Sequence, residues 1–146
     1  MTYKEFRVNI SKVLLTMGVV FGLHASVAYS VESVVPKFGS PLPNVAGKSL
    51  IAVEVSFPPG TVAAPHRHPK SAFLYVYVLS GIIRSQVEGE PAHTYHAGES
   101  WSEAPGAHHI LAANPSKTKA AKLLAVFVVD SDEKSLVTPD TVEVGK

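Results

Sequence analysis

The sequence contains no cysteine, which excludes disulfide bridges, thiolate metal sites and a cysteine nucleophile. Charged residues make up only 17% of the 146 residues, and 13 basic side chains nearly balance 12 acidic ones. Because no basic block stands out, the chain is not expected to bind nucleic acid. Its apolar content of 46% is enough for a buried core, and its length suits one domain.

Three widespread catalytic motifs are also missing. The sequence has no G-x-S-x-G nucleophile elbow, no P-loop and no glycine-rich dinucleotide fingerprint. Serine hydrolase and nucleotide chemistry therefore lack their usual marks in this chain.

No apolar run is as long as the roughly 20 residues that a membrane-spanning helix needs. The most apolar stretch, residues 13–23, follows the basic side chains of Lys4, Arg7 and Lys12 and precedes small residues ending at Ser30. This order is typical of a secretory signal peptide. We predict a signal peptide over residues 1–30 and a periplasmic or secreted protein that meets the membrane only through this segment. An uncleaved anchor and a buried first helix are the alternatives.

The remaining chain has the pattern of short strands between glycine and proline turns. Residues 51–57 alternate apolar and polar side chains, residues 73–79 are dense in aromatic and β-branched side chains, and residues 123–129 are nearly all apolar. We expect the last of these strands to be buried on both faces. Since no stretch has a helical stripe, the pattern predicts an all-β sandwich or barrel.

The flanking segments divide the chain further. Residues 31–49 are predicted to form an extended N-terminal arm or edge strand, residues 50–130 the barrel, and residues 131–146 a polar C-terminal tail on the surface.

Histidines are concentrated in two short segments. On a strand, His66 and His68 point to the same side, where two imidazoles can bind one metal ion, although such pairs also occur on surfaces without a function. His108 and His109 are neighbours and therefore face opposite sides of a strand, so only one of them can join the first pair.

The spacing of these histidines and of nearby glycines resembles the two-motif signature of the cupin superfamily. The resemblance spans residues 51–130 and implies a double-stranded β-helix, or jelly-roll barrel, with a metal bound in its mouth mainly by histidines. Two residues separate Gly106 from His109, as in the family pattern, which selects His109 over His108. The matching residues are Gly60, His66, His68 and Gly81 in the first motif, and Gly98, Gly106, His109 and, one residue late, Asn114 in the second.

The chain departs from the family pattern at its acidic residue. The family's glutamate would fall at Leu74 by the spacing to Gly81, or at Ala72 or Phe73 by the spacing from His68, and none of these can bind a metal. In the second motif, Ala104 replaces a proline. The resemblance then implies a metal site of His66, His68 and His109 with open positions, suited to Fe, Mn, Ni, Cu or Zn.

Other polar residues are candidates for the same site. Gln86 and Glu103 are candidate fourth ligands, although ordinary surface positions suit both of them. Arg84 is a candidate partner for a substrate carboxylate, and His108 is a candidate rim residue. Aromatic side chains form the walls of an apolar pocket or pack elsewhere; they are Phe73, Tyr75, Tyr77 and Trp101.

Two functions of different kinds remain open. One is a metal-dependent enzyme that performs Lewis-acid or dioxygen chemistry on a small molecule. The resemblance to cupins implies dioxygenase, isomerase, decarboxylase or lyase activity. The other is a non-enzymatic barrel that binds a metal or a small ligand. A metal-free, sugar-modifying barrel is less favoured because the motifs are poor in carboxylates. A homodimer through residues 73–79 and 31–49 is expected.

Overall fold

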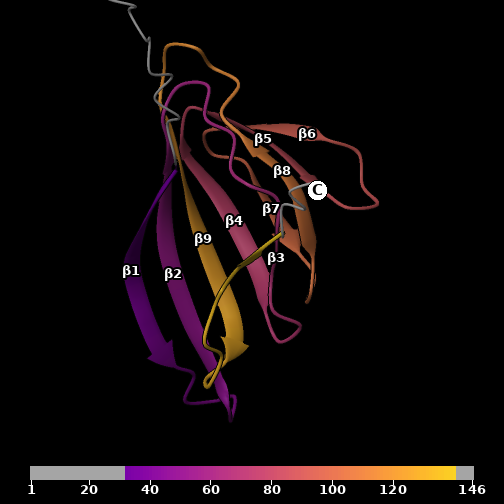
Figure 1. The fold of residues 1–146 in the computed structure, drawn as a ribbon. Coiled ribbons are helices and arrows are strands. Elements are labelled where there is room, and N and C mark those ends of the chain that lie inside the picture. The colour runs from indigo at the N-terminus through magenta and orange to yellow at the C-terminus, as the bar shows by residue number, and fades with distance from the viewer. Residues whose placement is uncertain (1–31, 141–146) are drawn as a thin grey trace, which may run out of the picture.

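Ten strands make up the regular structure of residues 32–140, which are the residues described by the computed structural model (Figure 1). The expected signal peptide lies outside them. One five-stranded antiparallel sheet has the order β1 (Ser33–Pro41), β2 (Lys48–Phe57), β9 (Ala121–Asp130), β4 (Phe73–Ser80), β7 (Ser100–Glu103). The other has the order β10 (Thr138–Pro139), β3 (His66–Arg67), β8 (His108–Ala113), β5 (Ile82–Val87), β6 (His93–His96).

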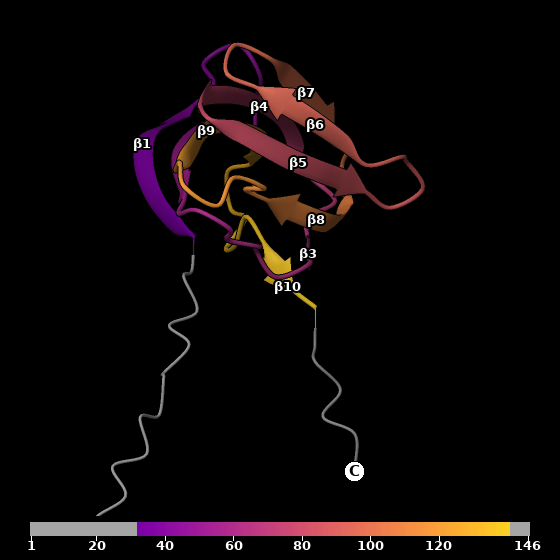
Figure 2. The same cartoon turned by 90° about the horizontal axis from the view of Figure 1, so that it is seen from above.

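The two sheets enclose a common interior, which the view from above shows (Figure 2). Residues 32–140 contain no helix, and the predicted all-β jelly roll is confirmed. In particular, the described residues include no helix capable of crossing a membrane.

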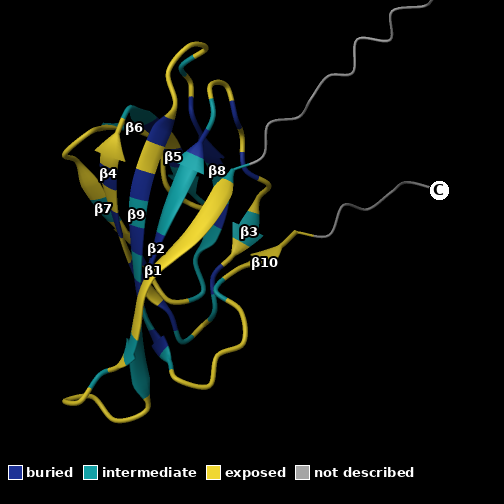
Figure 3. Ribbon diagram, turned by 90° about the vertical axis from the view of Figure 1, so that its left-hand side faces the viewer, coloured by how far each residue is buried: buried dark blue, intermediate teal, exposed yellow. Residues whose placement is uncertain are grey.

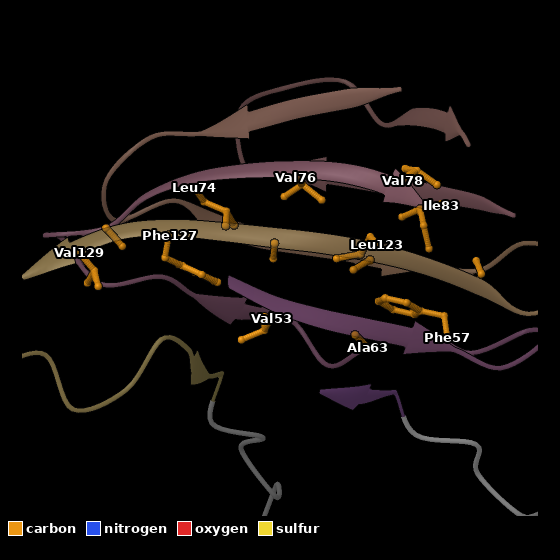
Figure 4. Close-up of a cluster of buried hydrophobic side chains, with 14 residues drawn as sticks. Val53, Phe57, Ala63, Leu74, Val76, Val78, Ile83, Leu123, Phe127 and Val129 are labelled. Carbon is orange, nitrogen blue, oxygen red and sulfur yellow. The ribbon is translucent and has the colours of Figure 1, made fainter. Parts of the chain in front are cut away.

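The core lies between the sheets and follows the alternation of the strands. Along β4 the inward side chains of Leu74, Val76 and Val78 are buried, whereas the side chains between them are exposed. Inward side chains of β2 and β9 complete the cluster in Figure 4, including Val53 and Phe127. The period of two in these segments therefore predicts the buried face correctly.

The expectation that β9 is buried on both faces is wrong. Its inward side chains, such as Leu123 and Phe127, are buried, but the outward Leu124, Val126 and Val128 are only partly buried. Figure 3 shows this alternation of burial along the strand. The reason is that no further layer of the described chain covers the outer face of this sheet.

Gly81 is the point at which the chain passes from one sheet to the other. It separates β4 from β5 and has a φ of 74°, a backbone conformation that favours glycine. A Cβ atom there would lie 2.7 Å from the carbonyl oxygen of Ala120. Glycine is thus required for this crossing.

The two ends of the described chain both join a sheet. β1 is an edge strand that pairs with β2, so residues 33–41 adopt the strand alternative of the predicted arm. The segment predicted as a surface tail returns through β10, which pairs with β3 and covers its otherwise open edge. The return places Leu136, Val137 and Pro139 beside a cavity in the barrel.

Candidate metal centre

Three histidines converge on the inner face of the second sheet. His66 on β3 is the direct partner of His109 on β8, and His68 follows immediately after β3. The centroid of the His66 ring lies 5.0 Å from that of the His68 ring and 5.2 Å from that of the His109 ring. Each ring offers a nitrogen atom that lies within 4.8 Å of the other two, which is a spacing that one metal ion can bridge.

Each of these rings forms a hydrogen bond that fixes its orientation. His66 and His68 donate through Nδ1 to the carbonyl oxygens of Ala64 and Leu136, each at 2.9 Å. Because a carbonyl can only accept, the neutral forms of both rings keep Nε2 unprotonated and free to bind a metal. The Nε2 atom of His109 lies 2.8 Å from the hydroxyl oxygen of Ser85, and its Nδ1 atom is directed toward Glu103.

A buried carboxylate lies next to the histidines. The side chain of Glu103, at the end of β7, has 0% exposure. Its Oε1 accepts a hydrogen bond of 3.0 Å from the indole of Trp101 and lies 3.4 Å from Nδ1 of His109. Its Oε2 lies 3.3 Å from Nε2 of His68.

These contacts and burial shift the pKa values of the three groups in different directions. Burial alone would raise the pKa of Glu103, but His68, His109 and Trp101 outweigh burial and lower it. Burial likewise disfavours the charged form of His68, but Glu103 and the Leu136 carbonyl outweigh it and raise the pKa of His68. For His109, burial prevails and lowers its pKa. Glu103 and His109 are thus held in forms that can donate electron pairs to a metal.

The donor set fits a divalent transition metal. His68 Nε2 and Glu103 Oε2 are both buried and have no hydrogen-bond partner. Buried polar atoms normally have a partner, and a cation would serve both of these electron-pair donors. Three imidazoles that leave further positions open are a ligand set seen in catalytic metal sites.

The histidines form part of the wall of an apolar cavity of about 220 Å³. Apart from the three histidines and Glu103, the only ionisable side chain among its described lining residues is Glu32, and no lysine or arginine lines it. β2, β4 and β9 contribute apolar side chains to the wall, such as Val53, Phe57, Leu74, Val76, Leu123 and Phe127.

Three of the other candidate residues are not brought to this cavity. Gln86 donates a hydrogen bond to the carbonyl oxygen of Glu90, and Arg84 is exposed on β5. His108 faces the opposite side of β8, where it contacts Glu88 at 3.3 Å and Asp140 at 2.8 Å.

The aromatic candidates fall into two groups. Trp101 lines the cavity and stacks on Tyr95, with 4.3 Å between the ring centroids. Phe73, Tyr75 and Tyr77 are exposed on the outer face of β4 and do not line the cavity.

Two partners of the histidines, Ser85 and the Leu136 carbonyl, were not predicted from the sequence. Ser85 lies two residues after the buried Ile83 on β5, so the period of the strand carried a signal that it faces inward. The Leu136 carbonyl carried no such signal, because a backbone atom in a polar segment is not marked by its side chain. Asn114, quoted for the second motif, is structural: its amide donates hydrogen bonds to the carbonyls of Phe57, Pro58 and Lys119.

Comparison with known families agrees with this geometry. The chain matches the Cupin_2 family model, described as a cupin domain, over residues 53–127. That match includes strands of both sheets, all three histidines and Glu103, and the chain therefore belongs to the cupin superfamily, within the cupin-2 type. The predicted family is confirmed. Comparison with curated proteins gave no match.

Solved structures share the fold at low sequence identity. An oxalate oxidase in complex with the substrate analogue glycolate is 24% identical, with a TM-score of 0.57 over 71% of this chain and 53% of that chain. The DMSP lyase DddQ from Ruegeria pomeroyi DSS-3 is 21% identical, with a TM-score of 0.56 over 70% and 49%. The Cupin_2 domain of an XRE family transcriptional regulator from Enterobacter cloacae is 18% identical, with a TM-score of 0.52 over 66% and 94%. The chain thus spans about half of the first two proteins, and the likeness is one of fold.

Proposed function

We propose that this cupin is a metal-dependent enzyme that performs Lewis-acid or dioxygen chemistry on a small molecule. The observation that carries the proposal is the convergence of three histidines within 4.8 Å at the wall of a cavity. His66, His68 and His109 would hold Fe, Mn, Ni, Cu or Zn. When bound, such an ion polarises a coordinated oxygen or binds dioxygen.

The cavity favours a small, uncharged and largely apolar substrate. Its volume of about 220 Å³ suits a small molecule, and apolar side chains form most of its wall. A small acid such as the glycolate of the oxalate oxidase complex would find no lysine or arginine among the described lining residues. Apolar walls orient a substrate by excluding water, while the histidine cluster provides the polar contact.

A non-enzymatic barrel that binds a metal or a small ligand is the second candidate. Outside the histidine cluster, Glu32 is the only ionisable side chain on the described cavity wall. A reaction that moves protons would therefore rely on the cluster itself, whereas simple binding makes no such demand.

Measurements of metal content and of turnover distinguish the enzyme from the non-enzymatic barrel. We expect protein purified without a histidine tag or chelator to contain close to one divalent metal ion per chain by plasma mass spectrometry. His66→Ala and His109→Ala should remove it and leave the circular dichroism spectrum unchanged. Multiple turnovers with an apolar oxygenated compound would support the enzyme, and stoichiometric binding without turnover the alternative. Absence of metal, with none taken up on reconstitution, would contradict both metal-dependent functions.

We also propose export, to the periplasm or outside the cell, supported by the signal-like pattern of residues 1–30. Mass spectrometry of the protein from the periplasm should give the mass of a chain that begins near residue 31. A full-length chain recovered only from the cytoplasm would contradict this proposal.

We further propose a homodimer through the outer face of the first sheet. This face is largely apolar, and its charged side chains are already paired within the chain, Lys48 with Asp130 and Glu54 with Lys37 and Lys122, so a second copy would not be repelled. Light scattering should give twice the chain mass for the wild type and a lower mass for Tyr75→Lys. A wild-type mass of one chain would contradict it. The apolar side chains of this face are Val35, Phe38, Leu50, Phe73, Tyr75, Tyr77, Leu124, Val126 and Val128.

A further inference from the structure

Glu103 and Leu74 are direct neighbours across two strands. Leu74 on β4 pairs with Glu103 on β7, both side chains are buried, and both line the cavity. Directly opposed residues of an antiparallel pair have Cβ atoms about 4.5–5.5 Å apart. A carboxylate missing at Leu74 is therefore present one strand away, on the same face of the same sheet.

The carboxylate of Glu103 is only partly satisfied by the protein. Oε1 accepts the hydrogen bond from Trp101, but Oε2 has no hydrogen-bond partner and the side chain is fully buried. No lysine or arginine is among the described residues that line the cavity. An ionised carboxylate buried without a compensating positive charge is strongly unfavourable, so this one calls for a cation.

The atom that contacts Oε2, Nε2 of His68, is itself an electron-pair donor when the ring is neutral. His68 donates through Nδ1 to Leu136, so Nε2 of the neutral ring presents a lone pair. This Nε2 lies 3.3 Å from Oε2, and it too has no hydrogen-bond partner. Two lone pairs that approach each other in a buried site repel unless a positive charge lies between them. In the metal-free protein a proton on Nε2 of His68 can supply this charge, and a metal ion within reach of both atoms would replace that proton.

From these contacts we infer that Glu103 is the fourth protein donor of the metal centre, delivered by β7 in place of a residue on β4. The inference rests on the proposed function, because it needs the metal that His66, His68 and His109 would hold. The carboxylate would add one negative charge to a site of three neutral imidazoles, which strengthens its hold on a divalent ion.

Cobalt binding tests this assignment without any need for the substrate. Co²⁺ would be titrated into chelator-treated protein, with the visible spectrum of the bound ion as a second readout. We expect Glu103→Gln to lower the affinity at least about 10-fold and to change the spectrum, because one donor of the ion is exchanged or lost. Glu90→Gln, which removes an exposed carboxylate outside the cavity, is the matched control and should leave both unchanged.

Transposition of the two side chains provides the sharper test. The double variant Leu74→Glu/Glu103→Leu keeps the composition of the cavity and moves the carboxylate to the opposing strand. It should recover most of the affinity that Glu103→Leu alone loses.

The outcomes distinguish this inference from the proposed function. If the wild type binds no Co²⁺, the proposed metal site itself fails. If the wild type binds it and His66→Ala does not, but Glu103→Gln keeps the wild-type affinity and spectrum, then only the role of Glu103 is overturned. A lower affinity with an unchanged spectrum would also overturn it, because Glu103 would then position the histidines without binding the ion.

Discussion

Two clusters of histidine and carboxylate groups lie back to back on β3 and β8. On the inner face, His66 pairs with His109, and Glu103 reaches the cluster from β7. On the outer face, the next residue pair is Arg67 with His108. The same two strands therefore present similar side chains to the cavity and to the solvent.

The clusters differ in how their charges are balanced. The outer carboxylates have partners within the chain, since Arg67 lies 3.7 Å from Glu88 and Nε2 of His108 forms a hydrogen bond of 2.8 Å with Asp140. The inner carboxylate is buried with imidazoles and an indole, and no arginine or lysine is among the described residues of the cavity wall. Two inner donor atoms have no hydrogen-bond partner, whereas in the outer cluster this holds for one atom, Nδ1 of His108. Residue type alone therefore does not define a metal site. The inner cluster is a candidate because its electron-pair donors are buried together without a lysine or arginine beside them.

The largest expected difference is in the response of metal affinity to loss of a histidine. His109→Ala removes an inner donor and should lower Co²⁺ or Zn²⁺ affinity by more than about 100-fold. This exceeds the usual cost of losing a side chain that only hydrogen-bonds to a metal ligand. His108→Ala, one residue away, should leave the affinity unchanged. Calorimetric titration of chelator-treated proteins measures both, and equal losses in the two variants would erase the distinction between the clusters.

A smaller effect is expected at the partner of an inner histidine. Ser85→Ala removes the hydroxyl that lies 2.8 Å from His109 Nε2, and the loss of such a partner lowers metal affinity by about 10–100-fold. Ser102→Ala removes an exposed hydroxyl from β7 and serves as the control. Metal titration should separate the two variants, and an unchanged affinity in Ser85→Ala would show that the hydroxyl does not orient the ring.

Acid should weaken the metal-free protein through the inner carboxylate. Since the pKa of Glu103 is lower in the folded state, its ionisation adds stability that is complete above its unfolded pKa of about 4.3. This contribution is lost as the pH falls through the lower folded pKa. Carboxylates titrate roughly between pH 5 and pH 3. Over this range the free energy of unfolding of the wild type should fall by more than that of Glu103→Gln.

Urea denaturation of chelator-treated protein at several pH values measures this difference. Glu133→Gln, which alters an exposed carboxylate far along the chain, should follow the wild type. Parallel curves for wild type and Glu103→Gln would mean that the inner carboxylate is not stabilised in its ionised form.

The smallest effect is expected in the outer cluster. The side chain of Asp140 is 41% exposed, and solvent-exposed ion pairs contribute about 0–1 kcal/mol. Asp140→Asn should therefore reduce the free energy of unfolding by less than about 1 kcal/mol and leave metal affinity unchanged. Urea denaturation and metal titration check the two parts, and a large loss of metal affinity would indicate coupling between the faces.

Much of the fold was predictable because its signals are local. The alternation in residues 51–57 and the density of β-branched and aromatic side chains in residues 73–79 follow from the geometry of a single strand. The spacing of His66, His68 and His109 relative to glycines likewise lies within two short segments. The burial of β9 was not predictable, because it depends on whether another layer covers the sheet.

The remainder of the site depends on long-range pairing. Glu103 faces the cluster because of the register between β4 and β7, which no local pattern reveals, and the sequence alone favoured a surface position for it. The return of the C-terminal segment, which brings the Leu136 carbonyl to His68, joins residues 68 positions apart. Such contacts are fixed by packing of the whole barrel rather than by the residues nearby.

The most direct test of the inner cluster as a metal centre is anomalous diffraction from crystals of the Co²⁺-loaded protein. We predict one strong peak between the three inner histidines, at about 2.0–2.2 Å from one nitrogen atom each of His66, His68 and His109. Glu103 should belong to the same coordination sphere. A peak at His108 and Asp140 instead, or no peak between the three inner histidines, would contradict it.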